Sequence, residues 1–214
     1  MSIRVLIADD HKVVAEGLCH LLEAHRDIEV VDTVQSGREA VHRAVELQPD
    51  VVLMDISMPD LNGIEATRII RKRCPGAQVV VLSVHSEPMH IVRALRAGAS
   101  GYVPKSSAGI DVVEAIRVVS GGKRYLHATI AEDVLGLLVE PAAIEDPLAR
   151  LSSREHQVLQ LIAEGRSVAE MANAFSLSPR TVETYRARMM GKLGIRDVAG
   201  LVKFAILNGV TSLE

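Results

Sequence analysis

The chain has 214 residues, 48% hydrophobic and 24% charged, which is enough for one large or two ordinary domains with proper cores and excludes a disordered chain. Its 24 Lys and Arg against 27 Asp and Glu give a formal charge of −3, which taken alone argues against a partner as acidic as nucleic acid. With two Phe, three Tyr and no Trp, it also lacks the stacked aromatic surface that binds single-stranded RNA or DNA.

Cysteine usage and hydropathy indicate the compartment. Cys19 and Cys74 lie far apart and offer neither a disulfide framework nor CxxC spacing. No apolar run approaches the roughly 20 residues that span a bilayer, and Asp9 and Asp10 stand where a signal peptide needs its apolar core. We therefore expect a cytoplasmic protein with no membrane segment.

From residue 3 to about 120, short β-branched runs alternate with amphipathic stretches of helical length, a pattern that predicts βαβ units and a parallel sheet. The expected strands are 3–8, 28–33, 51–55, 78–83 and 101–103. Five strands and five helices suit a doubly wound, flavodoxin-like α/β sheet of strand order 2-1-3-4-5. Its ligand crevice would lie at the carboxyl ends of the strands. We place this domain at residues 1–122.

The pattern changes after this domain. Residues 123–147 contain two prolines, five acidic residues and a possible short helix over 129–139, which predicts a linker. Residues 148–214 have helical periodicity, with S-x-x-E capping boxes at Ser152 and Ser167 and a Ser178-Pro179 helix start. Gly194 and Asp197 mark one further helix end and start. We expect a small all-α domain of four helices.

Three carboxylates are predicted to meet in the crevice of the sheet. Asp9 and Asp10 end the first strand and Asp55 ends the third, which neighbours the first in the expected order. Like charges this close need a cation, and an all-carboxylate site suits a hard ion such as Mg²⁺. The alternative is that Asp9 caps the helix beginning near His11.

A hydroxyl and an ammonium follow two later strands. Ser83 ends the fourth strand and Lys105 comes just after the fifth. Together with a metal and a carboxylate, they would form a site that receives an anion.

Residues 2–122 resemble the receiver domain of two-component response regulators, on the motifs Asp9-Asp10, Asp55-x-x-Met-Pro, Ser83, Tyr102 and Lys105. The resemblance implies that Asp55 takes a phosphoryl group from a sensor histidine kinase or a small phosphodonor such as acetyl phosphate. It also implies Mg²⁺ held by Asp10, Asp55 and the backbone carbonyl of Ser57, with Asp9 acting partly through water. Lys105 would pair with the phosphoryl oxygens.

The same resemblance implies a switch. In the family, the hydroxyl at the Ser83 position moves toward the phosphoryl group and the aromatic at the Tyr102 position turns inward. This is a local electrostatic event that biases a bistable element.

The segment Leu151–Gly209 resembles the LuxR-type helix-turn-helix of the NarL/FixJ response regulators, whose helix near Pro179 enters the major groove of double-stranded promoter DNA. Residues 178–196 carry five basic side chains against Glu183 alone, which favours phosphate contacts. The candidate DNA-contacting residues are Arg180, Thr181, Glu183, Thr184, Ala187, Arg188 and Lys192. Leu201, Val202 and Ala205 of the last helix could belong to the core or to the face of a homodimer.

The charge balance divides unevenly along the chain. Residues 1–125 hold 15 basic and 16 acidic residues, residues 126–147 none and five, and residues 148–214 nine and six. A basic DNA reader is therefore joined by an acidic linker to a nearly neutral receiver.

We consequently predict a transcriptional response regulator that phosphorylation at Asp55 switches, and not an enzyme. A phosphohydrolase with an aspartyl-phosphate would want a second Asp where Ser57 stands. The remaining alternative is a DNA-binding transcription factor that acts without phosphorylation and keeps a vestigial or purely interacting receiver.

Overall fold

The computed structural model describes residues 2–84, 87–107, 109–131, 134 and 146–211. The chain divides into two compact units, one of residues 1–58 and 62–144 and the other of residues 145–214 with 59–61. Each unit is described by itself. None of the described helices has the length and apolar character needed to cross a membrane.

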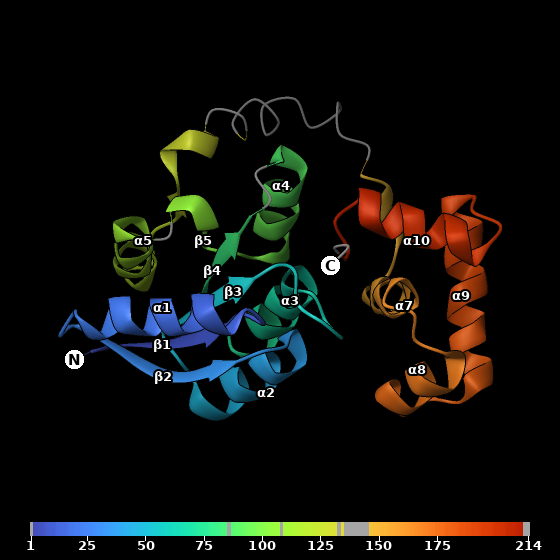
Figure 1. Ribbon diagram of the computed structural model, residues 1–214, viewed down its shortest axis with the longest axis horizontal. Helices are drawn as coiled ribbons and strands as arrows, with labels where there is room; N and C mark the ends of the chain where they lie inside the picture. Colours follow the sequence, from blue (N-terminus) through green and yellow to red (C-terminus); the bar gives the residue numbers. More distant parts are fainter. Residues whose placement is uncertain (1, 85–86, 108, 132–133, 135–145, 212–214) are drawn as a thin grey trace. The chain divides into compact units, whose positions relative to one another are not determined.

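The first unit is built on a parallel sheet of strand order β2-β1-β3-β4-β5-β6 (Figure 1). The strands are β1 (Ile3–Ala8), β2 (Ile28–Val34), β3 (Val51–Asp55), β4 (Gln78–Ser83), β5 (Gly101–Pro104) and β6 (Tyr125–Leu126). All five residues of β3 are buried, as expected for a central strand covered on both faces. The register pairs Ala8 with Met54, so β1 and β3 reach their carboxyl ends together.

Helices follow the strands in alternation and cover both faces of the sheet (Figure 1). They are α1 (Lys12–Glu23), α2 (Gly37–Leu47), α3 (Gly63–Arg73), α4 (Pro88–Ala97) and α5 (Ile110–Ser120), with a 3-10 turn η1 (Lys105–Ser107). Apolar residues of α1 and α5 pack on alternate residues of the strands, such as Ile7, Leu53 and Leu82, and form one buried core with them.

The doubly wound α/β fold is confirmed, with one correction. A sixth strand, β6, lies within residues 123–147, which the sequence predicts to be a linker. The backbone N–H groups of Tyr125 and His127 donate to the carbonyls of Ser100 and Tyr102 at 3.0 and 3.2 Å, so β6 covers the edge of β5. Of the helix expected over 129–139, residues 129–131 and 134 are helical and the others lie outside the described residues.

The second unit is all-helical, as predicted. It contains η3 (Pro147–Arg150), α7 (Ser153–Ala163), α8 (Val168–Phe175), α9 (Pro179–Leu193) and α10 (Val198–Leu207). Ser152 and Ser167 form complete capping boxes with Glu155 and Glu170, which confirms both predicted helix starts. Apolar side chains of α7 to α10 share one core.

Candidate functional site

The phosphoacceptor candidate lies in a buried acidic pocket at the carboxyl ends of β1 and β3. Asp55 is 3% exposed and Asp9 is 1% exposed, while Asp10 is half-buried. The parallel register brings these three carboxylates together from two neighbouring strands, as the sequence predicts.

Lys105 reaches the same pocket from the turn after β5. Its Nζ lies 2.7 Å from Asp9 Oδ2 and 2.9 Å from Asp55 Oδ2, and only 11% of its side chain is exposed. Pro104 ends β5 opposite Ser83, and η1 begins directly at Lys105. The ammonium thus lies between two carboxylates, where it offsets part of their repulsion.

His11 is a further member of the pocket that the sequence analysis did not single out as a site residue. Its Nδ1 lies 2.9 Å from Asp10 Oδ1 and 3.2 Å from Asp9 Oδ1, and its side chain is 58% exposed. The backbone N–H of His11 also donates to Asp9 Oδ1 at 2.9 Å, but His11 is itself the N-cap residue of α1 and this helix has no side-chain cap, so the alternative interpretation of Asp9 as a helix cap is wrong. The position of His11 directly after Asp10 is the signal that could have found it.

The donor set of the pocket fits a hard divalent cation. Single ligand atoms of Asp9, Asp10, His11 and Asp55 all lie within 4.8 Å of one another. Apart from the ion pairs with Lys105 and His11, Asp9 Oδ2, Asp10 Oδ1 and Asp55 Oδ2 have no hydrogen-bond partner among the described residues. Buried carboxylate oxygens with unused lone pairs are the ligands that Mg²⁺ prefers.

The pocket shifts the pKa values of its charged groups. Burial raises the pKa of Asp55, and the charges of Asp9 and Asp10 add to the rise, while Lys105 opposes it. Burial alone would lower the pKa of Lys105, but the Asp55 and Asp9 carboxylates outweigh it and the net shift is upward. Lys105 is therefore a permanent cation at neutral pH.

Ser83 and Tyr102, the candidate switch residues, are both fully buried at 0% exposure on the neighbouring strands β4 and β5. Burial raises the pKa of the Tyr102 hydroxyl, and a hydrogen bond with the Ser83 side chain acts in the opposite direction. The ring of Tyr102 therefore points into the first unit and its hydroxyl meets Ser83.

In the second unit, α9 follows α8 after a turn of three residues, 176–178, which is the spacing of a helix-turn-helix. Ser178 caps α9 by accepting from the Thr181 N–H, and Val182 and Met189 are fully buried in the core. On the remaining surface of α9, the exposed DNA-contact candidates are Arg180, Thr184, Ala187, Arg188 and Lys192, and the half-buried ones are Thr181 and Glu183.

Two of the basic side chains of α9 are held in ion pairs. Lys192 Nζ lies 2.6 Å from Oε2 of Glu155, a side chain on α7 that is only 3% exposed. Arg186 lies 2.9 Å from Glu183 on the same helix. Arg180, Arg188 and Arg196 are exposed and form no ion pair with any described residue. A count along the sequence treats the five basic residues of 178–196 as equivalent cations.

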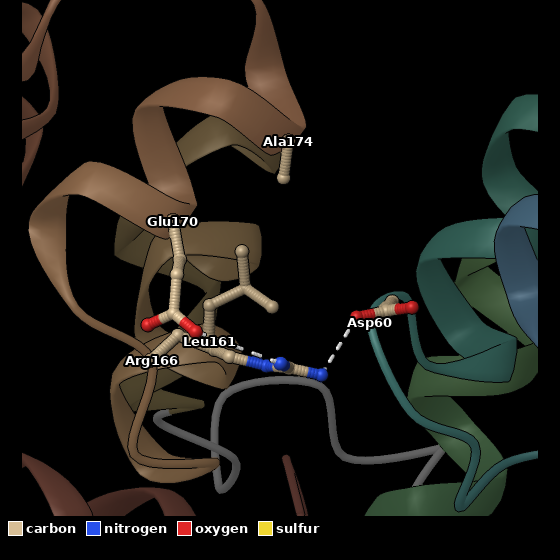
Figure 2. Close-up of a pocket in the computed structure, with 5 residues that line it drawn as sticks. All are labelled: Asp60, Leu161, Arg166, Glu170 and Ala174. Atoms are coloured by element: carbon tan, nitrogen blue, oxygen red, sulfur yellow. Dashed lines mark ion pairs between the residues drawn. The ribbon is translucent and has the colours of Figure 1, made fainter.

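Another basic side chain of this unit, Arg166, pairs with Glu170 at 3.9 Å across the start of α8. Figure 2 shows this pair beside Leu161 and Ala174 of the same unit. This guanidinium is also partly neutralised within the unit.

The apolar stripe of α10, which the sequence left open as core or dimer face, belongs to the core. Leu201 and Ala205 are fully buried in the core of their own unit, and Val202 is half-buried against it. The apolar stripe that the sequence shows therefore packs on α7, the helix that α10 contacts most extensively. The large apolar side chains exposed on α10 are instead Val198 and Leu207.

The fold and the pocket define a two-component response regulator, and comparison with known families agrees. Residues 5–117 match the response regulator receiver domain, and residues 149–205 match the bacterial regulatory proteins of the luxR family. The chain belongs to the response regulators of the NarL/FixJ type, which are transcription regulators with a receiver and a LuxR-type DNA-binding domain.

Individual relatives match along nearly the whole chain. The response regulator UvrY of Escherichia coli K12 is 40% identical over 99% of this chain and 97% of its own length. The response regulator GacA of Pseudomonas viridiflava is 38% identical over 97% of each chain. Among solved structures, RcsB of Salmonella enterica serovar Typhimurium, bound to a promoter in the presence of the phosphomimetic BeF₃⁻, aligns with a TM-score of 0.63 at 28% identity over 100% of both chains.

Proposed function

We propose that Asp55 is the phosphoryl acceptor of this response regulator and that a sensor histidine kinase or a small phosphodonor supplies the group. The observation that carries this proposal is the position of Lys105 Nζ, 2.9 Å from a carboxylate that is buried among two other carboxylates. A carboxylate oxygen of Asp55 attacks phosphorus, the bond from phosphorus to the donor breaks, and the donor leaves with the electron pair. Lys105 then pairs with the phosphoryl oxygens.

Asp9, Asp10, Asp55 and the backbone carbonyl of Ser57 are the proposed holders of Mg²⁺, with Asp9 acting partly through water. The ion supplies neutralisation of the charge that develops on the phosphoryl group in transit. Asp9 and Asp10 would hold the cation next to Asp55 and Lys105, where its charge acts on the phosphoryl group.

Ser83 and Tyr102 are the proposed switch residues. Both side chains are buried and they share a hydrogen bond, so a new acceptor at Asp55 competes for the Ser83 hydroxyl. Movement of Ser83 then changes the packing of Tyr102, which couples the pocket to β5 and the helices beside it.

The second unit is proposed to read double-stranded promoter DNA with α9 in the major groove. Arg180 and Arg188 are exposed without an ion-pair partner among the described residues, and Thr184 and Ala187 lie on the same exposed surface. RcsB, a relative of this chain, has been solved as dimers bound to DNA, which supports an active homodimer here. The proposed division is a receiver of residues 1–122, a connecting segment of residues 123–147 whose strand β6 joins the receiver sheet, and a DNA-binding domain of residues 148–214.

Incubation of the full chain with acetyl phosphate and Mg²⁺ tests this function. We expect the intact mass to rise by one phosphoryl group in the wild type and in the surface control Asp27→Asn, and not in Asp55→Asn. Fluorescence anisotropy of a labelled promoter duplex should then show tighter binding by the phosphorylated wild type and Asp27→Asn, and no change for Asp55→Asn. Equal labelling of wild type and Asp55→Asn would refute the assignment of Asp55.

The same experiment separates the second candidate, a DNA-binding factor that acts without phosphorylation. That candidate is favoured if the wild type takes up no phosphoryl group and Asp55→Asn binds DNA as the wild type does.

A further inference from the structure

Gly63, the first residue of α3, lies against the main chain of Asp55. A Cβ atom placed on Gly63 would stand 1.9 Å from the Asp55 carbonyl oxygen and 2.8 Å from its carbonyl carbon. Contacts under 3.0 Å are essentially never made by real Cβ atoms, and these obstacles are backbone atoms that have no rotamer to adopt. The dihedral φ of Gly63 is not positive, so the close contact and not the backbone conformation requires glycine here.

Several hydrogen bonds hold the start of α3 in this position. The backbone N–H of Gly63 donates to the carbonyl of Ile56 at 2.9 Å. The buried Asn62 side chain caps the helix by accepting from the Glu65 N–H at 3.0 Å. The hydroxyl of the fully buried Thr67 donates to the carbonyl of Gly63 at 2.6 Å. The helix is thus joined to the chain on the carboxyl side of Asp55 while it touches Asp55 itself.

We propose that Gly63 is a positioning residue for phosphoryl transfer, because its missing side chain lets α3 close on the main chain that carries Asp55 and Ser57. This inference rests on the proposed function and adds a residue that touches neither the phosphoryl group nor the metal. With alanine at this position, α3 and the Asp55 peptide must separate by about 1.5 Å or more to bring the 1.9 Å contact to the 3.4 Å at which ordinary contacts begin. The Asp55 carboxylate and the Ser57 carbonyl belong to that peptide segment, so both move with it.

Misplacement of reacting groups by about 1 Å can cost about a hundredfold in rate. We expect Gly63→Ala to weaken Mg²⁺ binding at least tenfold and to slow phosphorylation by acetyl phosphate at least tenfold. Both effects should occur in protein that remains folded.

Other glycines of the chain provide matched controls. A Cβ on Gly17 or Gly76 would meet no atom within 4 Å, so Gly17→Ala and Gly76→Ala test the substitution without the contact. A Cβ on Gly200 would lie 2.8 Å from a side-chain methyl of Ile195, so Gly200→Ala tests a crowded glycine in the other unit. We expect all three variants to stay within twofold of the wild type in both measurements.

The experiment measures Mg²⁺ affinity by isothermal titration calorimetry and the acetyl phosphate rate by intact mass, on full-length proteins shown by circular dichroism to be fully folded. Mg²⁺ affinity per folded molecule is the decisive readout, because a loss of global stability alone leaves it unchanged. A folded Gly63→Ala variant whose affinity and rate lie within twofold of the wild type overturns the proposal.

If Gly63→Ala does not fold, the Mg²⁺ affinities of Thr67→Val and Thr67→Ser test the proposal instead. Valine removes the hydroxyl that holds the Gly63 carbonyl, and serine restores it. At least threefold weaker Mg²⁺ binding in the valine variant, rescued by serine, supports the proposal, and a smaller change overturns it. If the wild type binds Mg²⁺ but takes up no phosphoryl group, the proposed function fails while the affinities still decide the role of Gly63.

Discussion

Lys192 tests whether a basic side chain of α9 contacts DNA or stabilises the second unit through an ion pair. The sequence places Lys192 among the phosphate contacts of α9, whereas in the structure its ammonium lies 2.6 Å from Glu155. Glu155 is the acidic member of the α7 capping box and its side chain is 3% exposed. Replacing Lys192 by methionine keeps the apolar stem of the side chain and removes only the cation.

The expected loss of stability follows from the surroundings of the pair. A hydrogen bond to a charged group contributes about 1.5–3 kcal/mol, and an exposed ion pair about 0–1 kcal/mol. The Lys192 side chain is 42% exposed, and Glu155 keeps its bonds from the Ser152 N–H at 2.7 Å and hydroxyl at 2.9 Å. We therefore expect a loss of about 1–2 kcal/mol, which corresponds to a fall in Tm of roughly 4–16 °C for a unit of this size.

The same substitution should leave the salt dependence of DNA binding nearly unchanged. An ammonium committed to Glu155 releases few counterions, so the slope of log affinity against log salt should hardly change in Lys192→Met. Arg188→Met, the matched control, should keep the Tm and reduce the steepness of that slope by about 0.9. Calorimetric unfolding and anisotropy of a labelled duplex over a KCl series measure the two effects. A Lys192→Met variant with unchanged Tm and a shallower slope would refute this reasoning.

Three further predictions concern local ion pairs and caps. Ser167→Ala removes one capping box and should lower the free energy of unfolding of the second unit by about 1 kcal/mol in urea titrations. Arg117 holds the pKa of Asp27 at about 2, so the stabilisation by this pair is complete above pH 3.8 and lost as the pH falls through 2. Arg117→Ala should return the pKa toward 3.8 in an NMR titration. Burial alone would raise the pKa of Glu155, but Lys192 and Ser152 lower it from its usual 4.5. The wild type should therefore lose stability as the pH falls below about 4.5, and Glu155→Gln should lack this part of the acid-induced loss.

Much of the first unit could be predicted because its strands are short, mainly apolar and β-branched runs that alternate with stretches of helical periodicity. The predicted bounds of β1, β3 and β4 are the observed ones. β6 was missed because two residues, Tyr125 and Leu126, are too few to show a period. Its pairing depends on backbone bonds to β5, which no side-chain pattern records.

The contacts of the functional residues likewise divide into those that the sequence predicts and those that it does not. The meeting of Asp9, Asp10 and Asp55 could be predicted because parallel strands end at one edge of the sheet. The contact of Gly63 with Asp55 could not, since it depends on how closely a helix approaches a strand end. The pair of Lys192 with Glu155 spans 37 residues and joins two helices whose packing angle the sequence does not state.

These pairs change how the charge of the second unit should be interpreted. A count along the sequence gives five basic residues in residues 178–196. Arg186 and Lys192 are neutralised by Glu183 and Glu155, so only three cations of this segment are free of ion pairs with described residues. Because counterion release follows the phosphates that are neutralised, this segment should contribute about three contacts to the salt dependence of DNA binding. Net charge therefore predicts that the unit binds DNA, but the internal ion pairs determine how steeply salt weakens that binding.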